Sequence, residues 1–528
     1  MDQRLSSLLS CNDAPSQEET DAILEHYSVT DMTDELARLN SQIACLQSSL
    51  EAITAKRDGV QEKLDVYRAA LSPIRRCPTE ILQQIFVATI DAFPVLSYGQ
   101  GPPLLGRVCS RWRAISWATS ELWSAVHVTI PEALHTFQDY DRKCERLRAS
   151  LSAWLTRAGT LPLYISMFSK NENTYREDVQ QVTQMLRVLV PYSKQWRYLS
   201  LQIPASSLNV LAELQGVDVP LLETALIACS DTNPFVLENT SRHPSFLETA
   251  PGLQYLSLGD AGPMFRPVVP WSQLRFLSMD HNDWNFGAQE LIEILAECSE
   301  LKECMLAIHA RTDLSHALND PISLLHLEKL SLNTNCVIMT EVLDQLCLPR
   351  LTHLHLDGYR AELNPAVLNS LKGMLHRSKY PLTSLKLEVK RSVTLSTSAL
   401  IDLLKSMPLL KGLVFAETST QTPIIDEELL KALSNMVDVV CPHLEYISIP
   451  DRFTFSEQAL ETFVTTRLDP PPELTRLQTA VIVSYRNGLA ERFSRFGERI
   501  RIIEDIPFRS LPSIGRPNSR YIEYSDEY

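Results

Sequence analysis

The stretch LEKLSL at residues 327–332 holds the pattern that decides the fold, with leucines at its first, fourth and sixth positions. The same spacing, with apolar exchanges, recurs from residue 196 onward, usually just after a helix-like segment. The nine good copies are WRYLSL (196–201), LQYLSL (253–258), LRFLSM (274–279), LKECML (301–306), LEKLSL (327–332), LTHLHL (351–356), LTSLKL (382–387), LKGLVF (410–415) and LEYISI (444–449). Weaker copies are LETALI (222–227) and LTRLQT (474–479), and successive copies start 21 to 34 residues apart.

Repeats of this length, each with one short strand, are typical of leucine-rich-repeat solenoids. The spaced apolar residues point into the core, and the residues between them point outward, because side chains alternate along a strand. Each unit buries its apolar face only by stacking on the next. Segments such as 291–298 (LIEILAEC) and 400–407 (LIDLLKSM) supply outer helices. We therefore predict an α/β leucine-rich-repeat solenoid over residues 196–504, ending in a cap that contains a helix and strand over 488–503.

The outward-pointing strand residues are the predicted target-binding positions on the concave face. Aromatic side chains in a shallow surface are typical binding anchors. Three of these positions would form an aromatic patch and the next four a basic or titratable patch. In chain order the predicted residues are Tyr198, Tyr255, Phe276, Lys329, His353, His355, Lys386 and Tyr446. For any one of them, local packing against the flanking repeats is an equally good interpretation.

A second informative stretch is Pro78–Trp123, which reads PTEILQQIF, then a loop over 92–106, then VCSRWRAIS and a Leu-Trp pair. Helical spacing places Ile81, Leu82, Ile85 and Phe86 on one side of a first helix. A second helix would carry an apolar face of Leu105, Val108, Cys109, Trp112 and Ile115. About fifty residues bury too little surface to form a confident domain alone, so this part should lean on its neighbours or on a partner.

These residues resemble an F-box, and the chain resembles more closely the F-box-like domain proteins of mushroom-forming fungi. Those chains similarly join a heptad helix to a motif like 72–82 here, then to motifs like 108–115, Leu122-Trp123 and the strand at 161–167. The resemblance implies that residues 73–123 bind a Skp-type adaptor of a cullin-RING (SCF-type) ubiquitin ligase. The implied adaptor-binding residues are Pro78, Glu80, Ile81, Leu82, Ile85 and Phe86. The alternative is a small helical cap over the N-terminal end of the solenoid, with Trp112 in its core.

Residues 31–72 predict one long helix with a coiled-coil seam. Seam positions are spaced by three and four residues without a break, over five heptads. They are Leu36, Leu39, Ile43, Leu46, Leu50, Ile53, Arg57, Val60, Leu64, Tyr67 and Leu71. Two interpretations stay open, a homodimer through 36–71 and a helix that folds back on its own chain.

The remaining segments complete the predicted organisation. Residues 1–30 are predicted to be disordered apart from a short helix, which a capping box at Ser16 to Glu19 starts and which ends near Tyr27. Residues 124–195 form a junction with the first strands, at 126–130 (VHVTI) and 161–167 (LPLYISM). Residues 505–528, rich in Pro, Ser and Tyr, are predicted to be disordered.

Composition limits the classes of partner. The net charge is −15 and the pI about 5.4, which argues against nucleic-acid and membrane partners because both favour basic surface. The 11 cysteines show neither a disulfide framework nor metal spacing, as in a reduced intracellular protein. No signal peptide or transmembrane stretch is recognised. We therefore expect a cytoplasmic or nuclear location, or both.

No catalytic motif is recognised, so we expect no enzyme, cofactor or metal. Cys298 and Cys304 are six apart without a CxxC and are predicted to be core thiols. His353-x-His355 near Asp357 could hold a metal, but solvated concave-face residues are the favoured interpretation. The predicted function is substrate recognition for an SCF-type ligase, with an unidentified protein target on the repeats. The alternative is a non-catalytic interaction scaffold without a ligase.

Overall fold

The structure is a computed structural model of the 528-residue chain. It describes residues 6, 10, 14–26, 29–97, 99–131, 137–169, 176–229, 245–259, 268–279, 288–308, 321–358, 364–379, 382–389, 396–417, 425–435, 438–450, 455–472, 474–483 and 493–503. The predicted disordered tail at 505–528 lies outside these residues. The chain divides into two compact units, residues 1–82 and 83–528, and each is described by itself.

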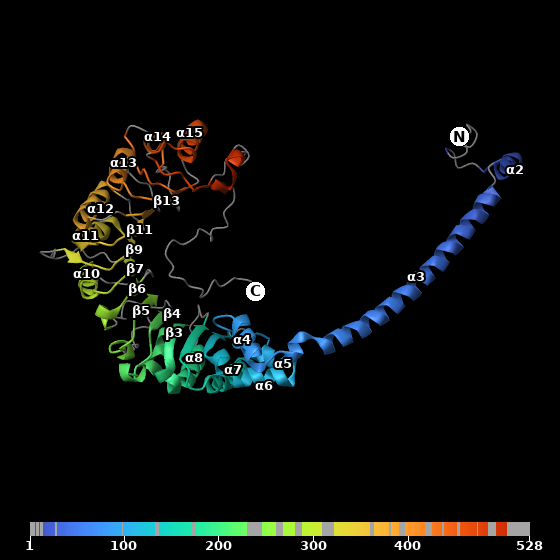
Figure 1. The fold of residues 1–528 in the computed structure, drawn as a ribbon, viewed down its shortest axis with the longest axis horizontal. Coiled ribbons are helices and arrows are strands. Elements are labelled where there is room, and N and C mark those ends of the chain that lie inside the picture. Colours follow the sequence, from blue (N-terminus) through green and yellow to red (C-terminus); the bar gives the residue numbers. More distant parts are fainter. Residues whose placement is uncertain are drawn as a thin grey trace. The chain divides into compact units, whose positions relative to one another are not determined.

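The first unit is dominated by one helix. Helix α2 (Gln17–His26) begins with the predicted capping box, in which the backbone N–H of Ser16 donates to Glu19 and the N–H of Glu19 donates to Oγ of Ser16. Helix α3 (Val29–Leu71) has 43 residues and is the long helix of Figure 1. A 3-10 turn, η1 (Pro73–Arg76), follows. The long helix is as predicted, and its apolar seam is exposed to solvent.

The segment predicted as two helices contains three. Helix α4 (Thr79–Thr89) is followed by α5 (Gly101–Val108), α6 (Ser110–Ala118) and the 3-10 turn η2 (Ser120–Trp123). The predicted loop at 92–106 was wrong in its second half, because α5 starts there, with prolines in its first turn. The predicted second helix is also broken at Cys109, an extended residue whose Sγ accepts from the N–H of Trp112.

In its described residues, the second unit is built on one parallel sheet of fourteen strands that neighbour one another in chain order. The strands are β1 (Ala125–Ile130), β2 (Leu163–Ser169), β3 (Trp196–Ile203), β4 (Thr224–Cys229), β5 (Tyr255–Gly259), β6 (Phe276–Met279), β7 (Glu303–Ile308), β9 (Lys329–Thr334), β11 (His353–Gly358), β12 (Ser384–Val389), β13 (Gly412–Glu417), β14 (Tyr446–Ile449), β15 (Thr479–Val483) and β16 (Ile500–Ile503). Strands β8 (Ile322–Ser323) and β10 (Leu346–Cys347) pair separately. The sheet starts at Ala125, so the strands of the predicted junction are already part of it.

Helices connect the strands and lie on the outer side of the curved sheet (Figure 1). They are α7 (Phe137–Ala158), α8 (Arg176–Leu189), α10 (Ala288–Glu297), α11 (Cys336–Gln345), α12 (Pro365–Ser378), α13 (Thr397–Lys405), α14 (Glu427–Ser434) and α15 (Glu457–Leu468), with 3-10 turns η3 (Val190–Gln195), η4 (Ala205–Leu211), η5 (Gly216–Asp218), η6 (Ser245–Leu247), η7 (Trp271–Gln273) and η8 (Ser494–Arg499). One strand and one helix or turn per repeat is the leucine-rich-repeat plan. The predicted C-terminal cap contains η8 and β16.

The repeat leucines form continuous rows through the core. Leu330, Leu354 and Leu385 are register partners on consecutive strands, and all three are buried. The register corrects the last predicted copy. Ala480 and Ile482, not residues of the motif LTRLQT, continue the core rows of Ile447 and Ile449. The repeat therefore begins at Leu477, three residues later than its sequence suggests.

Candidate protein-interaction surfaces

The predicted target-binding residues lie in two ladders that run across the strands. The strand register aligns Tyr198, Tyr255, Phe276, Lys329, His353 and Tyr446 in one ladder, together with Thr224, Glu303, Ser384 and Gly412. His355 and Lys386 belong to a second ladder, two residues further along each strand. The predicted residues therefore share one face of the sheet.

The aromatic residues of the first ladder do not form one open patch. The Tyr198 ring packs on Phe93, with ring centroids 5.0 Å apart. Phe93 lies between α4 and α5 in the helical region, residues 79–123, so this region covers Tyr198. The rings of Tyr255 and Phe276 are stacked, with centroids 6.3 Å apart. Tyr255 is 38% exposed and Phe276 only 8%. Phe276 was expected to be accessible; instead it supports Tyr255, the open aromatic residue of this group.

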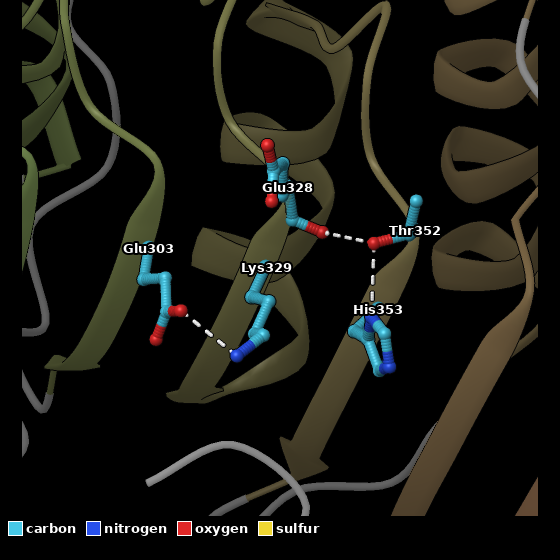
Figure 2. A network of polar contacts seen from close by, with 5 residues as sticks. All are labelled: Glu303, Glu328, Lys329, Thr352 and His353. Carbon is cyan, nitrogen blue, oxygen red and sulfur yellow. Dashed lines mark hydrogen bonds and ion pairs between the residues drawn. The ribbon is translucent and has the colours of Figure 1, made fainter. Parts of the chain in front are cut away.

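Polar contacts occupy the middle of the first ladder (Figure 2). Lys329 Nζ lies 2.8 Å from Glu303 Oε1. The Thr352 hydroxyl donates to the backbone oxygen of Glu328 at 3.0 Å, and its oxygen lies 2.9 Å from His353 Nδ1. Because the hydroxyl has one proton, Nδ1 of His353 must be the donor. The Nε2 atom of neutral His353 is then left to accept a hydrogen bond.

The environment favours neutral His353. Burial lowers the pKa of His353, and the charge of Lys329 lowers it further, against smaller opposite effects of Glu303 and Glu328. Removing water from around an imidazolium disfavours the charged form. This part of the face therefore presents a fixed ion pair beside an uncharged imidazole.

The second ladder has its own network. Nδ1 of His355 lies 3.0 Å from Ser331 Oγ, and Nε2 lies 3.4 Å from Glu388 Oε2. The same carboxylate oxygen is 3.2 Å from Lys386 Nζ. The two histidines thus have separate partners and do not converge on one point. Within the described ranges, no group of three or more His, Cys, Asp and Glu side chains is placed to hold a metal ion.

The two central cysteines are core thiols, as predicted. Cys298 and Cys304 are buried. Burial raises the pKa of Cys298 to about 12 and that of Cys304 well above its usual value. Such thiols are protonated and poor nucleophiles at neutral pH.

Helix α4 carries five of the six predicted adaptor-binding residues, Pro78 directly precedes it, and the six differ in exposure. Pro78 and Glu80 are exposed, as are Ile81 at 45% and Ile85 at 39%. Leu82 and Phe86 are 0% and 1% exposed. Phe86 packs on half-buried Trp112, with ring centroids 4.8 Å apart. The two buried residues stabilise the helix, and the accessible apolar side chains are Ile81 and Ile85.

The helical region also closes one edge of the sheet. Val95 forms a parallel bridge with His127 of β1, where His127 N donates to Pro94 O and Leu96 N donates to His127 O, both at 2.9 Å. An uncovered edge strand offers its backbone to other chains. Residues 94–96 therefore protect the backbone of β1 at His127. A cap at the N-terminal end of the solenoid is the alternative that the sequence left open beside the F-box interpretation.

A cavity of about 300 Å³ lies beside this cap and was not predicted. Its lining includes Arg107, Arg113, Arg157, Trp117, Trp123 and Trp154. The guanidinium of Arg157 lies 5.2 Å from the ring centroid of Trp117 and 5.0 Å from that of Trp123. The segment SRWRAISW at 110–117 supplies only Arg113 and Trp117 to this lining, so no local sequence pattern could have indicated the cavity. Cation–π stacking gives this arrangement a structural role.

Comparisons with known proteins add little to this description. No family model matches the sequence, and a search of curated proteins found no match either. Among solved structures, the chain is similar to one titled as the crystal structure of a TLR13–ssRNA13 complex, with a TM-score of 0.27 and 15% identity. The likeness covers 68% of this chain and 45% of that chain, so this chain spans less than half of that length. A TM-score this low carries no argument, and the solenoid assignment depends on the strand register.

None of the helices that the structure describes combines the length and the apolar character that a membrane span needs.

Proposed function

We propose that this chain is a non-catalytic substrate-recognition adaptor, which holds a protein target on its concave ladders and binds a Skp-type adaptor of an SCF-type ubiquitin ligase through α4. The observation that carries the target-binding half is the pair of neighbouring ladders, with Tyr255 in the first and His355 and Lys386 in the second. It combines an accessible aromatic residue with ordered charged groups on a rigid parallel sheet. Extended concave faces of this kind are the binding surfaces of repeat proteins.

The ligase half is supported by α4 and by the resemblance of residues 72–123 to an F-box. Ile81 and Ile85 are four residues apart, so they lie on the same side of the helix, and both are exposed. Exposed isoleucines at helical spacing suit a partner that buries them. Leu82 and Phe86 are buried, so the proposal gives them a supporting role beneath these two isoleucines.

The test is co-purification of the full chain with a Skp-type adaptor. The variant Ile81→Asp with Ile85→Asp should lose binding while its circular dichroism spectrum stays unchanged. Thr79→Asp, at an exposed position on another side of the same helix, is the control for adding charge and should bind as the wild type does. Absence of wild-type binding, or equal binding by the double variant, would remove the ligase half of the proposal.

The second candidate is a protein-interaction scaffold without a ligase. The bridge between Val95 and His127 favours this candidate, because it gives the helical region a structural role at the edge of the sheet that needs no ligase. A chain that binds no Skp-type adaptor but loses a protein partner on Tyr255→Ala would fit this candidate. The matched control for that substitution is Val337→Ala, at an exposed position of outer helix α11.

A further inference from the structure

The seam of α3 is an apolar row without a cover. Its apolar members from Leu36 to Leu71 are between 40% and 71% exposed. Met32, four residues before Leu36, extends the row and is 64% exposed. Helix α2 has 10 residues, about 15 Å at 1.5 Å per residue, against about 65 Å for α3. Among the described residues that precede α3, the helix α2 is therefore too short to cover the seam.

We infer that α3 pairs with α3 of a second copy of this chain, and that the two helices run antiparallel. The charge distribution along the helix carries the orientation. Residues 29–51 hold four acidic residues and one arginine, whereas residues 52–71 hold four basic and three acidic residues. An antiparallel pair sets the acidic half against the basic half.

The positions that flank the seam discriminate between the two orientations. Leu36, Ile43, Leu50, Arg57 and Leu64 are the seam residues that start each heptad. In an in-register parallel pair, the residue just before each of them faces the partner residue whose number is five higher. Lys63 would then face the partner's Arg68, and Glu35 would face the partner's Asn40. In an antiparallel pair centred between Leu50 and Ile53, Glu35 faces the partner's Lys63, and the symmetry supplies this contact twice. Parallel pairing therefore creates a repulsion where antiparallel pairing creates an attraction.

Arg57, the charged residue within the seam, points to the same orientation. A parallel pair in register would place Arg57 against the partner's Arg57, and two guanidinium groups would have to share the apolar seam. The antiparallel pair places Arg57 against the partner's Leu46. There its apolar stem can cover the leucine while its charged end reaches water.

Charge exchange in the full chain tests this arrangement by analytical ultracentrifugation. The wild type should dimerise, and Glu35→Lys and Lys63→Glu should each weaken the dimer roughly five- to thirtyfold, given the modest energy of exposed ion pairs. The double variant should recover most of the affinity because the pair is restored with its signs exchanged. Asp34→Lys makes the same charge change on the side of α3 away from the seam and should have little effect.

Two results would overturn the inference. A wild-type chain that sediments as a monomer at tens of micromolar would exclude the second copy as the occupant. Tighter association of Lys63→Glu would indicate the parallel pair, because it would relieve the repulsion between Lys63 and the partner's Arg68. The inference does not depend on the proposed ligase function, since neither substitution lies on α4 or on the sheet.

Discussion

Single residues on the concave face gain their properties from neighbouring strands. His353 illustrates this, because its ring is fixed by Thr352 and its charge is opposed by Lys329 from the next strand. Nothing in the local sequence LTHLHL distinguishes His353 from a solvated histidine. The pairing of β9 with β11 brings Lys329 level with it.

We expect the pKa of His353 to lie below the usual histidine value of about 6.5, because burial disfavours its charged form. The unfolded chain then binds more protons, so the contribution of His353 to stability falls as pH drops from about 7 through 6.5, and levels off below the native pKa. Lys329→Met should raise the native pKa, because it removes a positive charge and leaves Glu303 unpaired. Chemical-shift titration of labelled histidine, with His353→Gln to assign the resonance, measures both values. An unchanged midpoint in Lys329→Met would contradict this account of the site.

At the scale of elements, the outer helices share one way of starting. Five of them, α11 to α15, begin after Asn335, Asn364, Ser396, Asp426 and Ser456, and each of these side chains accepts from a backbone N–H three residues later. The same N-cap hydrogen bond thus recurs at these five helix starts with interchangeable Asn, Ser and Asp residues.

Asn364→Ala should cost about 1 kcal/mol of stability, the usual loss on removing an N-cap. Its Oδ1 accepts from Val367 N at 3.0 Å, whereas Ser396 Oγ accepts from Ala399 N at a longer 3.5 Å. Ser396→Ala should therefore cost less than Asn364→Ala. Urea unfolding followed by circular dichroism measures the two changes. Equal losses would mean that the caps act through something other than this hydrogen bond.

Helices and strands were predictable from sequence where the apolar pattern repeats. They were less predictable where a single contact determines the end of a helix or the register of a strand. The Leu-x-x-Leu-x-Leu units place most strands, since one unit confirms the next. The helix break at Cys109 was missed because an apolar face continues through it. The last repeat was misaligned because Leu474 imitates the motif, whereas pairing with β14 selects Leu477.

At the scale of the whole repeat array, neighbouring repeats are joined by a buried arginine, Arg467, and a half-buried one, Arg377, which no sequence pattern revealed. Arg467 of α15 is 0% exposed, and it donates to the backbone oxygens of Leu433, Val440 and Cys441. Arg377 of α12 similarly donates to Leu343 and Leu346 at the end of α11. From sequence, an arginine in a helix is usually predicted to be exposed to water. The positions of these two arginines become understandable only when the carbonyl groups that face them from the previous repeat are known.

Arg467→Met should destabilise its region by about 3 kcal/mol, because buried carbonyl groups lose charged donors. Each repeat contacts mainly its neighbours, so the damage should stay local. Hydrogen exchange read by mass spectrometry should rise around β14 to β16 and remain unchanged at β1 to β6. Arg377→Met should move the affected region to α11 and α12. Uniformly faster exchange in either variant would mean that the array unfolds as one unit.

The spacing between the parallel strands also constrains how an extended peptide could bind across the sheet. Adjacent strands are about 4.8 Å apart, whereas residues of a peptide in the extended polyproline II conformation rise about 3.1 Å each and repeat their side-chain direction every third residue. Two strand spacings therefore nearly equal three peptide residues. A peptide crossing the strands would come back into step at every second strand, for example at Glu303 and then at His353, which the order β7-β9-β11 separates by one strand. A peptide bound in this way would be recognised at every third side chain, and the side chains between would be free to vary.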